Sequence, residues 1–147
     1  MHSGGWTDIY VLTEKRSSAL IERFLQTFLP ERAESADDYA VRCSSEGDTL
    51  CISQVSTAIQ YCCQHSMAEL AIYWRNTGPG TPRAAMVFFT TDEHLILGLS
   101  VANESAAPEY LKRLRLLADS EYGYMAYEEP PIMTAVDFRA VNRANLP

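Results

Sequence analysis

The sequence predicts an α+β domain: an antiparallel or mixed β-sheet of about five to six strands, with three helices packed mainly on one face. Three observations lead to this class. Apolar residues alternate in some segments and recur at helical spacing in others. The expected order is β-α-β-α-β-β-β-α-β, and consecutive strands are typical of antiparallel pairing. The chain has 147 residues, of which 47% are hydrophobic and 21% charged, and this fits one globular domain spanning 1–147.

The first segments are predicted as a strand followed by a helix. Residues 1–5 contain two glycines and are expected to form a flexible tail. Residues 8–13 are rich in β-branched and aromatic side chains, which favours a strand. Ser17 or Ser18 is a suitable N-cap for a helix that Pro30 stops. The apolar stripe of this helix consists of Leu20, Ile21, Phe24, Leu25, Phe28 and Leu29.

The next stretch combines loops with short regular elements. Residues 31–38 are polar and rich in acids, so we expect a loop, whereas residues 39–43 alternate like a short strand. A turn at 44–48, around Gly47, leads to a second helix that begins near Ser53. The apolar stripe of this helix consists of Val55, Ala58, Ile59 and Cys62.

Three strands are predicted in the middle of the chain. Residues 70–75 alternate, and after a Gly- and Pro-rich loop at 76–82, residues 84–102 form a hairpin that turns at 91–93. Large apolar side chains share one face: Leu70, Ile72, Trp74, Leu95, Leu97, Leu99 and Val101. The other face carries mostly small or polar ones: Ala71, Tyr73, Arg75, Ile96, Gly98, Ser100 and Ala102. We therefore expect one sheet face to be only half covered and open to a ligand or partner.

The C-terminal part is predicted as a helix, a strand and a tail. Ser105 is a suitable N-cap for the helix, and Pro108 suits its first turn. The buried stripe consists of Tyr110, Leu111, Leu114, Leu117 and Ala118. Residues 123–128 are expected to form the last strand, which two prolines end. The tail, 135–147, has one apolar cluster that is able to dock: Val136, Phe138 and Val141.

Charge and cysteine usage limit the classes of partner. The net charge is -7 and the pI is about 4.9, so nucleic acid and anionic membranes would be repelled, whereas a basic partner would be attracted. We see no signal peptide and no apolar run near the ~20 residues that span a bilayer. The four cysteines do not suggest a disulfide scaffold. We therefore expect reduced thiols and a cytoplasmic location.

The residues do not suggest a catalytic or metal-binding constellation. Cys62 and Cys63 lack the spacing of a zinc site, and as neighbours on a helix they point in different directions. Ser100 falls inside a predicted strand rather than at the strand-to-helix turn of a nucleophile motif. Adjacent acids occur at 37–38, 92–93 and 128–129. Such pairs are usually solvated surface charge. We therefore expect no enzyme activity, cofactor or metal.

The stretch YGYMAYEEPP, residues 122–131, is the most unusual part of the sequence. In a strand, Met125 is the natural core residue, which turns Tyr122 and Tyr124 outward. Tyrosines are enriched in interface cores, and acids beside them are able to pair with Arg or Lys of a partner. The candidate partner-binding residues are Tyr122, Tyr124, Tyr127, Glu128, Glu129, Asp37 and Asp38. The alternative is that these rings pack half-buried under the third helix or the tail.

A small, acidic α+β chain with no catalytic constellation and with this segment resembles bacterial immunity proteins made against polymorphic secreted toxins. The likeness is one of overall type together with residues 122–131. It implies a cytoplasmic antitoxin that binds and neutralises a cognate toxin domain, without cofactor or turnover. The acidic charge suggests a basic toxin domain, such as a nuclease.

Two other hypotheses remain open. The chain is alternatively a small ligand-binding domain or enzyme, with a pocket over Tyr73, Arg75 and Ser100 on the less apolar sheet face. A third hypothesis is a structural or secretion-accessory protein that self-associates through that face. The sequence leaves the oligomeric state undetermined.

Overall fold

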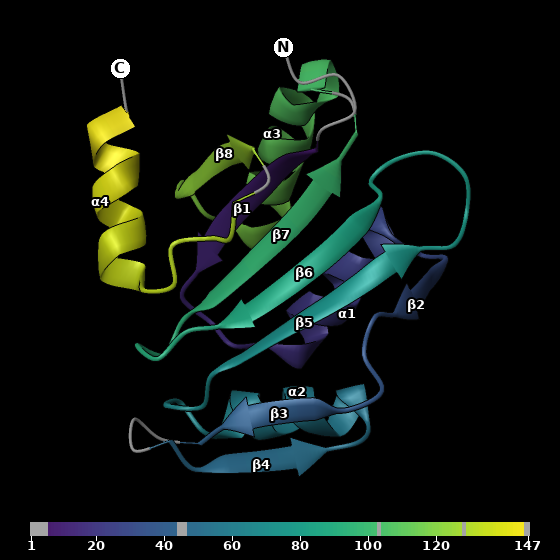
Figure 1. Cartoon of the computed structure of the whole chain (residues 1–147). Helices are drawn as coiled ribbons and strands as arrows, with labels where there is room; N and C mark the ends of the chain where they lie inside the picture. Colours follow the sequence, from purple (N-terminus) through teal and green to yellow (C-terminus); the bar gives the residue numbers. More distant parts are fainter. Residues whose placement is uncertain (1–5, 44–46, 103, 128, 146–147) are drawn as a thin grey trace.

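A six-stranded antiparallel sheet forms the centre of the fold (Figure 1). The computed structural model describes residues 6–43, 47–102, 104–127 and 129–145. The strands, in spatial order, are β2 (Arg32–Glu34), β5 (Leu70–Asn76), β6 (Ala84–Phe89), β7 (Leu95–Val101), β1 (Thr7–Thr13) and β8 (Gly123–Tyr127). The expected α+β class is confirmed, and β2 and β8 are the two edges of this sheet.

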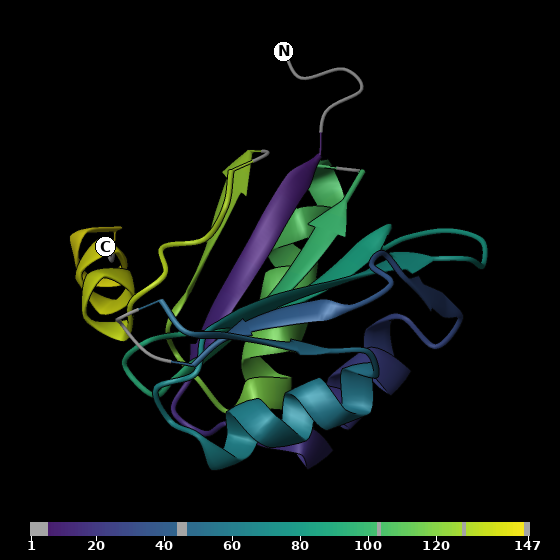
Figure 2. The ribbon, with the colours of Figure 1, turned by 60° about the horizontal axis from the view of Figure 1, so that its bottom comes forward.

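The helices lie on both faces of the sheet, but unequally. Three of them cover one face: α1 (Ser18–Phe28), α2 (Val55–Gln64) and α3 (Ala107–Ala118), which follows the short 3₁₀ turn η1 (Glu104–Ala106). A fourth helix, α4 (Ala135–Asn145), packs on the opposite face near β8 (Figure 1). Strands β3 (Tyr39–Arg42) and β4 (Thr49–Ile52) form a separate hairpin that lies against α2 (Figure 2).

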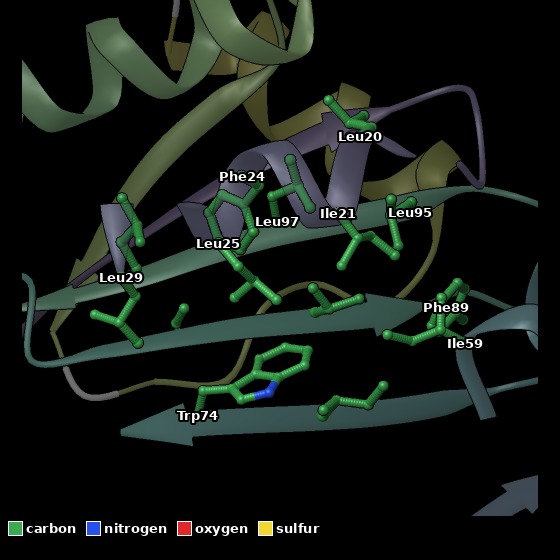
Figure 3. Close-up of a cluster of buried hydrophobic side chains, with 14 of the residues drawn as sticks. Leu20, Ile21, Phe24, Leu25, Leu29, Ile59, Trp74, Phe89, Leu95 and Leu97 are labelled. Carbon is green, nitrogen blue, oxygen red and sulfur yellow. The ribbon is translucent and has the colours of Figure 1, made fainter. Parts of the chain in front are cut away.

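The main core lies between the sheet and helices α1 to α3. Figure 3 shows the α1 side chains Phe24 and Leu25 directed at the strands that carry Trp74 and Leu97. Helix α1 begins where the sequence predicts, because the Ser17 hydroxyl accepts a hydrogen bond of 3.1 Å from the backbone N–H of Leu20. Burying each large apolar side chain of this helix stabilises the fold by roughly 1.5–3 kcal/mol.

A second, smaller core lies on the opposite face, under α4. Its buried members are Tyr10, Leu12, Met86, Phe88, Ile96, Ala126, Ala135 and Phe138. Aromatic rings cross this face in an unbroken series from Tyr73 on β5 to Phe138 on α4. Successive ring centroids lie 5.8 Å (Tyr73–Phe88), 6.1 Å (Phe88–Tyr10), 5.6 Å (Tyr10–Tyr124) and 4.9 Å (Tyr124–Phe138) apart. The C-terminal segment therefore docks as a helix, through Phe138, whereas Val136 is exposed.

Three local predictions were wrong. The predicted loop at 31–38 contains β2, a strand of three residues that has too few alternating apolar positions to be recognised. Strand β4 was missed because three of its four side chains are exposed and give no burial pattern. The N-cap of α3 is Ala106, not Ser105, since η1 occupies the preceding residues. The predicted tail at 1–5 and residues 44–46 of the predicted turn lie outside the described residues, but Gly47 has the turn-like φ of +94°.

Candidate functional site

The segment singled out by the sequence forms β8, the outer strand beside β1. Tyr124 stands opposite Tyr10 and Met125 opposite Ile9 in the antiparallel register. Because side chains alternate along a strand, Tyr124 and Ala126 face the side of α4, whereas Gly123, Met125 and Tyr127 face the side of α3. The strand therefore contributes to two different surfaces.

Tyr124 is a half-buried packing residue. Its ring lies between those of Tyr10 and Phe138, and its hydroxyl accepts a hydrogen bond of 2.9 Å from the backbone N–H of Ile132. Burial raises the pKa of Tyr124. The expectation that Tyr124 points outward was wrong, because α4 covers the face on which it lies.

Met125, which the sequence predicts as a core residue, is instead 41% exposed. The core-facing residue at the start of β8 is Gly123: a Cβ there would lie 2.9 Å from Leu111 Cδ1 and 3.0 Å from Val11 Cγ2. The Leu111 side chain of α3 thus packs closely over Gly123, and a larger residue there would displace it. Met125 lies further along the same face of an edge strand, where burial is incomplete.

The other predicted residues of this segment differ in exposure. Tyr122 is half-buried, with the Arg139 guanidinium 5.5 Å from its ring centroid. Tyr127 is 44% exposed. Glu129 is exposed, and its carbonyl oxygen accepts a hydrogen bond of 2.5 Å from the Tyr10 hydroxyl. Glu128 lies outside the described residues.

Asp37 and Asp38 do not join the tyrosines. Both are exposed, but they lie in the segment between β2 and β3, whereas the tyrosines lie in or next to β8, at the opposite edge of the sheet. The Asp38 carboxylate lies beside Cys51 of β4 and raises the pKa of that thiol. The predicted partner-binding residues therefore belong to two separate regions. Three exposed residues in and just after β8 are Met125, Tyr127 and Glu129, and we refer to them as the β8 edge patch.

The alternative pocket residues share one sheet face, and a strand lies between two of them. Arg75 stands opposite Ala84, and Ala84 stands opposite Ser100 on the next strand, so β6 separates the two polar side chains. Tyr73 is 46% exposed. Neither of the two best-formed cavities in the described part of the chain includes Tyr73, Arg75 or Ser100.

The two cavities lie on the helical side of the fold and at the end of β1. The smaller, of about 180 Å³, lies between α1 and α2 beside Trp74. The larger, of about 790 Å³, lies where β1 ends, α1 begins and α3 ends, with Arg139 of α4 on its wall. Sequence reasoning missed this larger cavity, because three stretches distant in the chain build it (12–23, 115–122 and Arg139) and no motif marks them.

Three side chains of types that often react are buried or in contact with neighbouring groups: Cys62, His94 and His65. Burial raises the pKa of the Cys62 thiol to about 12, which keeps it protonated at neutral pH. His94 Nδ1 lies 2.6 Å from the carbonyl oxygen of Asp92, and its Nε2 lies 3.0 Å from a guanidinium nitrogen of Arg139. The His65 ring stacks on Tyr61 at 3.9 Å. Among the residues with described positions, no group of three or more His, Cys, Asp or Glu side chains is arranged to hold a metal ion.

The comparisons with known proteins identify no relative. No family model matches the chain, and no curated protein or solved structure matches it. Within the described ranges, no helix has the length and apolar character needed to cross a membrane.

Proposed function

We propose that the chain is a non-catalytic protein-binding module that neutralises a toxin domain, as immunity proteins do, and that it binds through the β8 edge patch. The observation that carries this proposal is the exposure of Met125 and Tyr127 on the same face of the outermost strand. Tyr and Met are enriched in protein interfaces, and Tyr supplies a large contact area at low entropic cost. Glu129, two positions after Tyr127, is exposed and supplies a negative charge at the rim.

Charge favours a basic partner. The net charge of -7 would attract a cationic domain at long range and speed its association. The exposed acids Asp37 and Asp38 at the opposite edge of the sheet contribute to this field without contacting the same partner surface. A nuclease toxin domain, which must carry positive charge to bind phosphates, has the matching chemistry.

The experiment is coexpression with the protein encoded by the adjacent reading frame, followed by growth assays and calorimetry of the purified pair. We expect growth rescue and a 1:1 complex whose affinity weakens as salt rises. Tyr127→Ala should weaken binding by about 2 kcal/mol or more, as expected of an interface-centre tyrosine.

Tyr73→Ala is the matched control. Tyr73 is 46% exposed and Tyr127 is 44% exposed, but Tyr73 lies on the opposite sheet face and on β5. The control should leave binding unchanged. An equal effect of the two substitutions, or an adjacent gene product with no toxicity, would contradict the proposal. A homodimer that Tyr73→Ala dissociates would instead favour self-association through the open face.

A further inference from the structure

The larger cavity has a lining rich in cations, although the chain as a whole is acidic. Its volume is about 790 Å³, and its walls include Lys15, Arg23, Arg115 and Arg139. These are four of the 12 Lys and Arg residues in the sequence. They come from the loop after β1, from α1, from α3 and from α4, so the fold alone brings them together.

Three of these cations form no ion pair with a described residue: Lys15, Arg23 and Arg115. Arg139 differs, because its guanidinium lies 3.5 Å from the Glu14 carboxylate and 3.0 Å from His94 Nε2. Two further acids line the cavity, Asp119 and Glu121, and both are exposed. The lining therefore carries more positive than negative charge, in contrast to the rest of the molecule.

Arg115 provides a second and independent observation. Its Nη2 donates a hydrogen bond of 3.1 Å to the carbonyl oxygen of Gly123, which fixes the guanidinium at the cavity wall. Its Nε is buried and has no acceptor among the described residues. A buried donor without an acceptor is costly and uncommon in folded proteins, so such a group needs an explanation. Because this Nε has almost no accessible surface, an anionic oxygen in the cavity becomes its acceptor only when the guanidinium turns toward the cavity.

The rest of the lining sets the remaining chemistry of the ligand. Leu12, Leu20, Leu116 and Leu117 line the same cavity, together with the half-buried ring of Tyr122. Its volume lies within the range of roughly 300–1,000 Å³ that is typical of small-molecule sites. A ligand that fits therefore combines an anionic group with an apolar body.

We propose that this cavity binds a small organic phosphate. The phosphate group lies against Arg115, with Lys15 and Arg23 as further charge partners, and the apolar part contacts the leucines. A phosphate is favoured over a carboxylate because guanidinium groups match phosphate oxygens in geometry, and because Lys15, Arg23 and Arg115 form no ion pair with a described residue. This inference is independent of toxin neutralisation, since the β8 edge patch contributes no residue to the cavity.

The test is an NMR titration of the full chain with phenyl phosphate. We expect saturable binding with a dissociation constant at or below about 1 mM. The shifted backbone amides should be those of the cavity wall, from Lys15 to Ser17 and from Leu117 to Tyr122. Phenol, which lacks the charge, should not bind, and benzoate should bind more weakly. Benzoate binding as tight as that of phenyl phosphate, or shifts spread over basic residues elsewhere, would overturn the proposal.

Charge-removing variants separate a built site from general attraction. Arg115→Gln and Arg23→Gln should each weaken binding by about tenfold or more, as expected for a charge-assisted hydrogen bond. The matched control is Arg75→Gln, which removes an exposed arginine from the open face of β5 and should change nothing. If Arg115→Gln does not fold, Arg23→Gln decides, because Arg23 is exposed on α1. An equal loss in Arg75→Gln would overturn the proposal.

Discussion

The carboxylate of Asp92, in the β6–β7 turn, accepts a hydrogen bond of 2.7 Å from the backbone N–H of Ala135, the first residue of α4. The same oxygen lies 3.4 Å from the N–H of Val136, and the other oxygen accepts a bond of 2.6 Å from the Thr90 hydroxyl. A side chain distant in sequence thus caps the helix and interacts favourably with its positive end. This cap and the buried ring of Phe138 attach α4 to the sheet.

Asp92→Asn should reduce the free energy of unfolding by about 1–2 kcal/mol, because the helix loses a charged cap. Chemical denaturation followed by circular dichroism measures this change. Asp137→Asn is the control: Asp137 is an exposed acid in the first turn of α4, and its loss should cost no more than about 0.5 kcal/mol. Equal effects would mean that general helix electrostatics, rather than the cap from the turn, stabilises α4.

The Asp92 cap should also make stability depend on pH. Burial alone would raise the pKa of Asp92, but hydrogen bonds from Thr90, Ala135 and Val136, with the nearby His94, lower it below its ordinary value. A carboxyl group with a lowered folded pKa stabilises the fold fully above its unfolded pKa of about 3.9, and this contribution is lost as pH falls through the folded pKa.

Denaturation of the wild type and of Asp92→Asn from pH 7 to pH 3 tests this dependence. The difference in unfolding free energy should be constant at and above about pH 5 and should shrink below about pH 4. A difference that already vanishes between pH 7 and pH 5 would show that a histidine, rather than Asp92, governs the attachment.

Phe138→Ala should weaken the attachment from the apolar side. The ring is completely buried and lies 4.9 Å from the Tyr124 ring, so its removal leaves a cavity on the α4 face of the sheet. We expect a loss of about 3–4 kcal/mol, measured by thermal or chemical denaturation. Val136→Ala, at a side chain 71% exposed, should change stability by less than about 0.5 kcal/mol. If the two losses are similar, α4 does not depend on Phe138 for docking.

The fold was predictable where the apolar pattern was strong. The alternation of Leu70, Ile72 and Trp74 gave β5 and its buried face, and the hairpin of β6 and β7 followed from two β-rich runs around a polar turn. The pattern failed for β2 and β4, whose side chains are mostly exposed or only partly buried. Backbone hydrogen bonds to a neighbouring strand hold such strands in place. Because this pairing does not require a pattern of polar and apolar side chains, the sequence does not reveal it.

The candidate site was less predictable, because it depends on contacts between distant segments. Alternation along β8 was correct, since Tyr124 and Ala126 do share one face. Which face is buried depends on α4 and α3, and the sequence does not show that α4 covers Tyr124. The cationic cavity was missed for a similar reason: Arg23 and Arg115 are 92 positions apart and meet only when α1 and α3 pack on the same sheet.

Gly123→Ala tests where the core lies along β8. A Cβ at this position would lie 2.9 Å from Leu111 Cδ1, 3.0 Å from Val11 Cγ2 and 3.1 Å from the carbonyl oxygen of Tyr10, so the Leu111 side chain must move and β1 must give slightly. We expect a loss of about 1–3 kcal/mol from overpacking, measured by denaturant unfolding. Met125→Ala, two residues further on the same face, should cost less than about 1 kcal/mol because its side chain is partly exposed. The reverse order of the two losses would restore Met125 as the core residue of β8 and would remove it from the proposed binding surface.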